Sequence, residues 1–220
     1  MPPSPSVRPA LSSPRLLLTG FGPFPGAPRN PTAEVVARLA EPGVGRRLGV
    51  EIVPHVFPTT WTAIDDLAAL LDAVRPDLVL HLGLKRRATA IAVEAVGRNR
   101  VTLAAVDAEG RRPMAPTLDA AAPPRLAVTL PVGRIVARIA GLGLAVEFST
   151  DAGRYLCNAL LWRSLRLAGR RPTGFLHLPP TRDLAGPGCG FTATDLARAT
   201  AAAIEEIVVR RRTVGPAVPA

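Results

Sequence analysis

The residue of this chain best suited to act as a nucleophile is Cys157, in the segment Asp151-Ala-Gly-Arg-Tyr-Leu-Cys-Asn158. A predicted strand ends just before this segment, and Asp151 is a suitable N-cap for a helix that runs to Leu167. Cys157 would then lie in the first two turns of the helix, where the helix N-terminus lowers a thiol pKa and favours the thiolate. The alternative interpretation is a buried cysteine with only a packing role, which is common for free cysteines.

A thiol nucleophile needs a base nearby, and the base needs an acceptor that orients it. The three histidines, His55, His81 and His177, all fall in predicted strands. His81 and His177 lie near strand carboxyl ends, where open α/β sheets carry their reactive groups, and spacing does not choose between them. Glu94 lies in an apolar stretch where a charge is costly without a partner. It is either the orienting carboxylate or a strand-edge residue that faces water.

Apolar runs that alternate with amphipathic segments predict the elements that would position these residues. Strands are expected at residues 16–19, 50–57, 77–82, 89–96, 126–130, 145–149 and 174–178. Helices are expected from Thr32 to about Ala40, from Thr59 or Thr60 to Val74, from Pro131 to about Leu142, from Asp151 to Leu167, and from Thr192 or Thr194 to about Arg210. This alternation predicts an α/β fold, with a mainly parallel central sheet that helices cover on both faces. Residues 15–210 would form a single domain between two disordered tails, at residues 1–14 and 211–220.

The loop Gly20-Phe-Gly-Pro-Phe-Pro-Gly26 superficially resembles a dinucleotide-binding fingerprint. Its last glycine comes one position late, and Pro23 and Pro25 lack the N–H groups that a pyrophosphate would need. Phe21 and Phe24 instead predict a small apolar pocket, in a chain that has few aromatic residues; otherwise both pack under the loop as core.

The composition excludes several other classes of protein. The net charge is +10, but the basic residues are scattered and Lys85 is the only lysine, so nucleic acid is not expected as the partner. The two cysteines, Cys157 and Cys189, form no disulfide framework and no Cys/His cluster, so neither a metal nor another cofactor is expected. No apolar run has the length of a membrane span, and the first residues lack the apolar core of a signal peptide, so a cytoplasmic protein is expected.

Five blocks of the sequence together resemble the pyroglutamyl peptidase I (pyrrolidone carboxyl peptidase) family, from about Leu16 to about Val208. The likeness depends on the order and spacing of the blocks. They are Thr19-Gly-Phe-Gly-Pro-Phe24 with Asn30-Pro31, Pro76-Asp77 through His81-Leu-Gly83, Val93-Glu94 with Asn99, Ala152-Gly-Arg-Tyr-Leu-Cys-Asn158, and Gly174-Phe-Leu-His-Leu-Pro179.

The resemblance implies a three-layer α/β/α sandwich and a cysteine peptidase that removes N-terminal pyroglutamate from small peptides. It places the catalytic Cys, His and Glu on Cys157, His177 and Glu94, and so favours His177 among the histidines. It further implies that the lactam ring binds against Phe21 and Phe24, with Asn30 and the backbone of Leu84 fixing it. Self-association into a homo-oligomer is compatible with the family.

The sequence also departs from the family pattern around these residues. Arg87 and Ala88 stand where the family usually has Gly-Arg, and Ala104 replaces an arginine close to the active site, followed by Val106-Asp107-Ala108. Arg87, Arg98 or Arg100 are candidates to supply a guanidinium from a shifted position. The alternative function is therefore a diverged or weakly active member of the family that acts on another small amide, ester or lactam.

Overall fold

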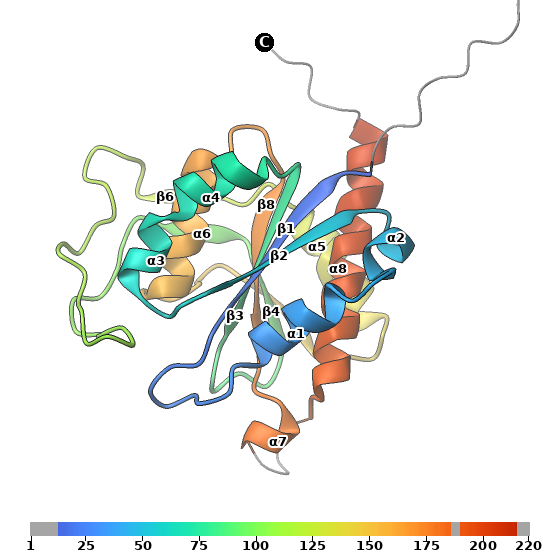
Figure 1. The fold of residues 1–220 in the computed structure, drawn as a ribbon, viewed down its shortest axis with the longest axis horizontal. Helices are drawn as coiled ribbons and strands as arrows, with labels where there is room; N and C mark the ends of the chain where they lie inside the picture. Colours follow the sequence, from blue (N-terminus) through green and yellow to red (C-terminus); the bar gives the residue numbers. More distant parts are fainter. Residues whose placement is uncertain (1–12, 186–189, 215–220) are drawn as a thin grey trace, which may run out of the picture.

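A computed structural model describes residues 13–185 and 190–214 of the chain (Figure 1). Most of the two predicted tails lies outside the described residues, as does Cys189. No helix in the described part of the chain is both long enough and apolar enough to cross a membrane.

A six-stranded sheet forms the centre of the molecule, in the order β2-β1-β3-β8-β4-β7. Its strands are β1 (Arg15–Phe21), β2 (Glu51–Phe57), β3 (Leu78–Leu84), β4 (Ile91–Glu94), β7 (Val146–Ser149) and β8 (Thr173–Leu178). The neighbouring pairs are parallel except β4 with β8, which are antiparallel. The predicted mainly parallel sheet is therefore confirmed, with one reversal in direction between β8 and β4.

Helices cover both faces of this sheet and complete three layers (Figure 1). One face packs against α1 (Pro31–Leu39), α2 (Val44–Leu48), α5 (Val132–Ala140) and α8 (Ala193–Val214). The other face packs against α3 (Trp61–Asp65), α4 (Leu67–Val74) and α6 (Leu156–Leu167). A short ribbon of β5 (Val96–Arg98) and β6 (Arg125–Ala127) runs beside α6, and α7 (Arg182–Ala185) follows β8.

Strand β3 illustrates why both faces are apolar. Leu78, Leu80 and Leu82 are buried in the cluster under α1, α5 and α8, whereas Val79 is buried in the cluster under α3, α4 and α6. Successive side chains of a strand point to opposite faces, so a strand covered on both sides reads as a continuous apolar run. His81 shares its face with Val79, which is the face that α6 covers.

Several predicted elements differ from the observed ones at their ends or in their middle. Asn30, not Thr32, caps α1, because its side-chain oxygen accepts the N–H of Thr32. The helix predicted to run to Val74 is interrupted at Asp66. The strand predicted over 89–96 ends at Glu94, and the chain then turns into β5.

The prediction that Asp151 caps the helix of Cys157 is wrong. That helix, α6, begins at Leu156, and Asp151 instead accepts a hydrogen bond from the N–H of Gly153, two residues on. Aspartate often bonds its own backbone in this way in a turn, and Gly153 has a positive φ of 80° that suits a turn. The correction moves Cys157 closer to the start of its helix.

Candidate active site

Cys157 is the second residue of α6, and its thiol is partly exposed. Tyr155 occupies the N-cap position with an extended backbone and provides no side-chain hydrogen bond to the first turn. The first N–H groups of a helix have no acceptor within the helix, and they form the positive end of its dipole. The thiol thus lies beside unneutralised donors, which favours an anion at this place.

Gly83 in β3 leaves the space that the sulfur occupies. A Cβ atom at residue 83 would lie 2.8 Å from Sγ of Cys157 and 2.6 Å from the ring of Phe175. Carbon atoms do not approach other heavy atoms so closely, so any side chain at residue 83 would displace the thiol or the ring. The thiol is therefore held close to the backbone of the sheet.

His177 and Glu94 form a buried pair on the sheet face that α6 covers. Nδ1 of His177 lies 2.7 Å from Oε1 of Glu94, and both side chains are almost fully buried. In the sheet Glu94 pairs with Phe175, whereas His177 pairs with Ala92. Because β4 runs antiparallel to β8, the carboxyl end of β4 points away from the thiol, and Glu94 lies beneath the imidazole.

This environment raises the pKa of His177. Burial by itself lowers the pKa, but hydrogen bonds to Cys157 and Glu94 and the charges on both partners outweigh burial and raise it to about 9. Oε2 of Glu94 is buried and has no hydrogen-bond partner within the described part of the chain. Because this buried carboxylate has so few other hydrogen bonds, it interacts strongly with the imidazolium.

The other two histidines do not reach the thiol. His81 is fully buried, with Nδ1 2.7 Å from Oγ1 of Thr19 and Nε2 2.9 Å from Oγ of Ser164. Burial, with a smaller contribution from the charge of His55, lowers the pKa of His81 to about 3, so this side chain is neutral. His81 is thus a core histidine with a hydrogen-bond partner at both ring nitrogens. His55 lies on β2, and the strands β1 and β3 separate β2 from β8.

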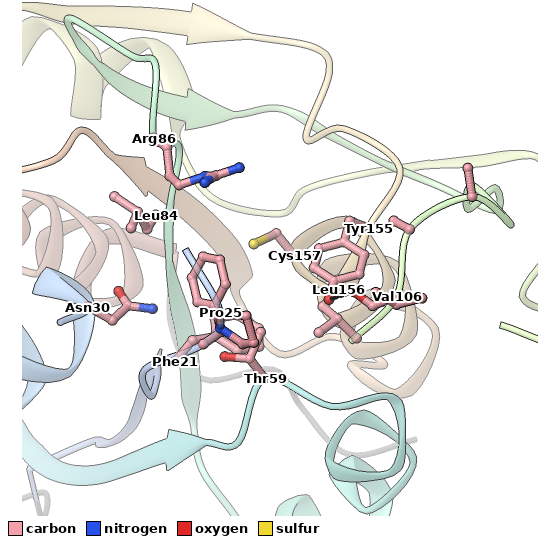
Figure 2. A pocket seen from close by; sticks show the side chains of 13 residues that line it. Phe21, Pro25, Asn30, Thr59, Leu84, Arg86, Val106, Tyr155, Leu156 and Cys157 are labelled. Atoms are coloured by element: carbon pink, nitrogen blue, oxygen red, sulfur yellow. Dashed lines mark hydrogen bonds between the residues drawn. The ribbon is translucent and has the colours of Figure 1, made fainter. Parts of the chain in front are cut away.

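A cavity of about 560 Å³ opens beside the thiol (Figure 2). Figure 2 shows the sulfur of Cys157 pointing into it, across from Asn30 and Leu84. The structure brings all four predicted binding residues to this cavity. Its lining comprises Phe21, Phe24, Pro25, Asn30, Thr59, Leu84, Arg86, Ala104, Ala105, Val106, Tyr155, Leu156 and Cys157.

Some of the polar groups of the cavity already form hydrogen bonds within the protein. The Asn30 side chain accepts the N–H of Thr32 and donates to the carbonyl of Gly22 at 3.1 Å. An amide NH₂ has two hydrogens, so Asn30 retains one donor. The β1–β3 register ends at His81, and in a parallel strand alternate N–H groups point to opposite neighbours. The N–H of Lys85 donates to β8, so the N–H of Leu84 points to the opposite side of β3. That is the side on which β1 no longer pairs with β3.

The arginine that lines this cavity is Arg86, which the sequence analysis did not single out. Arg87 and Arg100 are exposed and line neither cavity at the thiol, and Arg98 donates to the carbonyl of Thr150, away from the first cavity. In Figure 2 the Arg86 side chain lies above Leu84. Its position two residues after the end of β3 was the signal that could have identified it.

A second cavity of about 540 Å³ meets the first at Leu84, Tyr155 and Cys157. His177 lines this second cavity but not the first, so the imidazole lies on the second cavity's side of the thiol. Its remaining lining consists of Lys85, Glu147, Phe148 and the residues from Ser149 to Arg154. The thiol therefore lies at the junction of two open spaces, with the imidazole beside the second.

The buried side-chain amide of Asn158 holds the loop next to the thiol. Asn158, directly after Cys157, accepts the N–H of Arg98 at 2.8 Å and donates to the carbonyls of Arg98 and Arg100. On the opposite side of the loop, the Tyr155 hydroxyl donates to the carbonyl of Val106 at 2.8 Å. The apolar wall at residues 104–106 is thus tied to the start of α6.

The family model described as pyroglutamyl peptidase matches residues 14–208. The pyrrolidone-carboxylate peptidase of Chromobacterium violaceum is 36% identical over 176 residues, which cover 79% of this chain and 82% of that protein. The enzyme of Gloeobacter violaceus is 34% identical over 180 residues, 79% of this chain and 86% of that protein.

Solved structures agree with these matches. The crystal structure of pyroglutamyl peptidase I from Bacillus amyloliquefaciens superposes with a TM-score of 0.81 at 26% identity, over 89% of this chain and 97% of that one. The pyrrolidone carboxyl peptidase from Thermococcus litoralis gives a TM-score of 0.84 at 24% identity, over 94% of this chain and all of that one, which supports the fold. The expected fold, family and enzyme class are confirmed: the chain belongs to the pyroglutamyl peptidase family of cysteine-type peptidases.

Proposed function

We propose that this protein removes N-terminal pyroglutamate from peptides, with Cys157 as nucleophile, His177 as base and acid, and Glu94 as the carboxylate that orients the imidazole. The observation that carries the proposal is the position of the thiol. It lies between an apolar cavity, whose few polar groups suit a small lactam, and the buried His177–Glu94 pair.

In the first step the imidazole of His177 takes the proton of the Cys157 thiol, and Glu94 stabilises the resulting imidazolium. The thiolate attacks the carbonyl carbon of the pyroglutamyl residue, so that a C–S bond forms and negative charge develops on the carbonyl oxygen. The free N–H groups at the start of α6 are donors suited to that oxygen. The C–N bond then breaks, and the leaving amine receives the proton from His177.

A water molecule completes the cycle by attacking the thioester. His177 accepts a proton from this water, the C–S bond breaks, and pyroglutamate leaves while the thiol is restored. Pyroglutamate has no free α-amine, so its site needs no anionic group. This agrees with a first cavity that is lined by Phe21, Phe24, Leu84 and small aliphatic side chains, with Asn30 and the Leu84 N–H as donors.

The test is release of an arylamine from a pyroglutamyl-arylamide. Turnover should vanish in Cys157→Ala and after alkylation by iodoacetamide. Cys189→Ser is the matched control, because the chain has only these two cysteines; it should retain turnover and the same sensitivity to alkylation. Absence of turnover in the intact, folded protein would overturn the proposal.

A second candidate is a relative that uses the same thiol on another small amide, ester or lactam. The observation in its favour is the wall formed by Ala104, Ala105 and Val106, which presents only aliphatic groups to the first cavity. This candidate predicts that a thiol-reactive probe labels Cys157 rapidly, and that His177→Ala slows the labelling, while pyroglutamyl-arylamides are not cleaved. Efficient pyroglutamyl cleavage would exclude it.

A further inference from the structure

The second cavity at the thiol has the position of a site for the leaving group. A carbonyl attacked by Cys157 has its acyl part on one side of the sulfur and its amine on the other. The acyl part has a place in the first cavity, and the imidazole that must protonate the amine lines the second. A peptide that leaves the pyroglutamyl residue therefore passes through the second cavity.

Some of the charged side chains that line this cavity are in ion pairs, and one is not. Lys85 lies 3.5 Å from the carboxylate of Glu147, and Asp151 lies 3.6 Å from the guanidinium of Arg98. Both carboxylates of the cavity are thus in ion pairs. Arg154 lines the same cavity, is exposed, and has no ion-pair partner within the described part of the chain. An unpaired cation remains, in a protein whose net charge of +10 already attracts anions.

We propose that the second cavity binds the peptide that follows the pyroglutamyl residue, and that Arg154 selects short peptides with a free C-terminal carboxylate. An extended residue spans about 3.3 Å, so the carboxylate of a leaving group of two or three residues lies about 7–10 Å from the scissile bond. Arg154 precedes the nucleophile by three residues and lines the cavity that this leaving group would occupy. Arginine is the side chain best suited to hold a carboxylate, through two parallel hydrogen bonds.

This inference rests on the proposed function, and it assigns the substrate class as pyroglutamyl tripeptides and tetrapeptides with a free carboxyl end. The assay compares kcat/KM for one such peptide with kcat/KM for its C-terminal amide, in low-salt buffer. The free acid should be favoured about threefold to fivefold, as expected for one exposed ion pair. The preference should shrink as salt is added, because exposed charges are screened.

Three variants distinguish an effect of the Arg154 side chain from an effect of the overall charge of the protein. Arg154→Gln should abolish the acid-over-amide preference, and Arg154→Glu should reverse it. Arg87→Gln removes the same charge from an exposed residue that lines neither cavity, and it should leave the preference unchanged. Circular dichroism and thermal unfolding check that each variant is folded.

The outcomes distinguish this inference from the proposed function. If the pyroglutamyl-arylamide is not cleaved at all, the proposed function fails. If the arylamide is cleaved but acid and amide peptides are turned over equally, or if Arg87→Gln changes their ratio as much as Arg154→Gln, then the assignment of Arg154 fails while the proposed function stands.

Discussion

Glu94 should control the protonation of His177, and Glu94→Gln tests this with little change in shape. The rise in the pKa of His177 from 6.5 to about 9 corresponds to roughly 3 kcal/mol in favour of the imidazolium. The hydrogen bond to Cys157 contributes at least as much of the rise as Glu94 does. Removal of the carboxylate charge should therefore cost roughly 1 to 1.5 kcal/mol, or about tenfold in the thiolate–imidazolium pair.

The sign of the pH effect follows from the raised pKa. The imidazolium is present below about pH 9 and is lost as the pH rises through that value. In Glu94→Gln this loss should move to lower pH by about one unit, so kcat/KM should fall about tenfold above pH 9 and change little at neutral pH. The measurement is the pH profile of kcat/KM for a pyroglutamyl-arylamide, together with the rate of alkylation of Cys157.

The matched control is Glu205→Gln, because Glu205 is partly exposed and pairs with Arg138 on the opposite side of the sheet from α6. This variant should keep the wild-type profile. An alkaline limb that stays in place in Glu94→Gln would refute the reasoning, because the charge of Glu94 would then not act on His177.

Two further predictions concern buried groups around the site. Gly83→Ala should destabilise the protein by about 1–3 kcal/mol in urea unfolding and reduce kcat, because the added Cβ overlaps Sγ of Cys157; Gly133→Ala, whose Cβ would meet nothing within 4 Å, should do neither. Equal effects of the two substitutions would contradict this account. Because the pKa of His81 is lowered to about 3, its contribution to stability is complete above pH 6.5 and is lost as the pH falls toward 3. The slope should approach about 1.4 kcal/mol per pH unit, and urea unfolding of His81→Gln across this range should be less pH-dependent.

The helices and strands were largely predictable because each has a local cause. Apolar runs that are buried on both faces, such as Leu78 to Leu82, identify a strand in a covered sheet whatever its neighbours are. The start of α6 was not predictable from the same kind of signal. Asp151 has the chemistry of an N-cap, and only the tertiary structure shows that its carboxylate bonds Gly153 in a turn instead.

The choice of the histidine beside the thiol shows a different limit of prediction from sequence. Residue patterns left His81 and His177 equivalent, because both lie in apolar strands that end at the same edge of the sheet. They pair through their neighbours, His81 with Phe175 and Gly83 with His177, and so lie at different depths on the same sheet face. The position of a residue along the sheet depends on the register between strands that are far apart in the sequence. A local sequence pattern does not determine this register.

The direction of β4 explains why a carboxylate at a strand's carboxyl end serves as the buried member of the site. Had β4 run parallel to β8, Glu94 would lie at the open edge of the sheet, where water would weaken its interaction with an imidazole. Because β4 is antiparallel, its last residue lies opposite Phe175, below His177 and away from solvent. In that position the carboxylate has one described hydrogen-bond partner, the imidazole, and interacts with it in a medium of low polarity. The reversed direction of β4, which β7 shares, thus converts an ordinary strand-end glutamate into the group that sets the charge of His177.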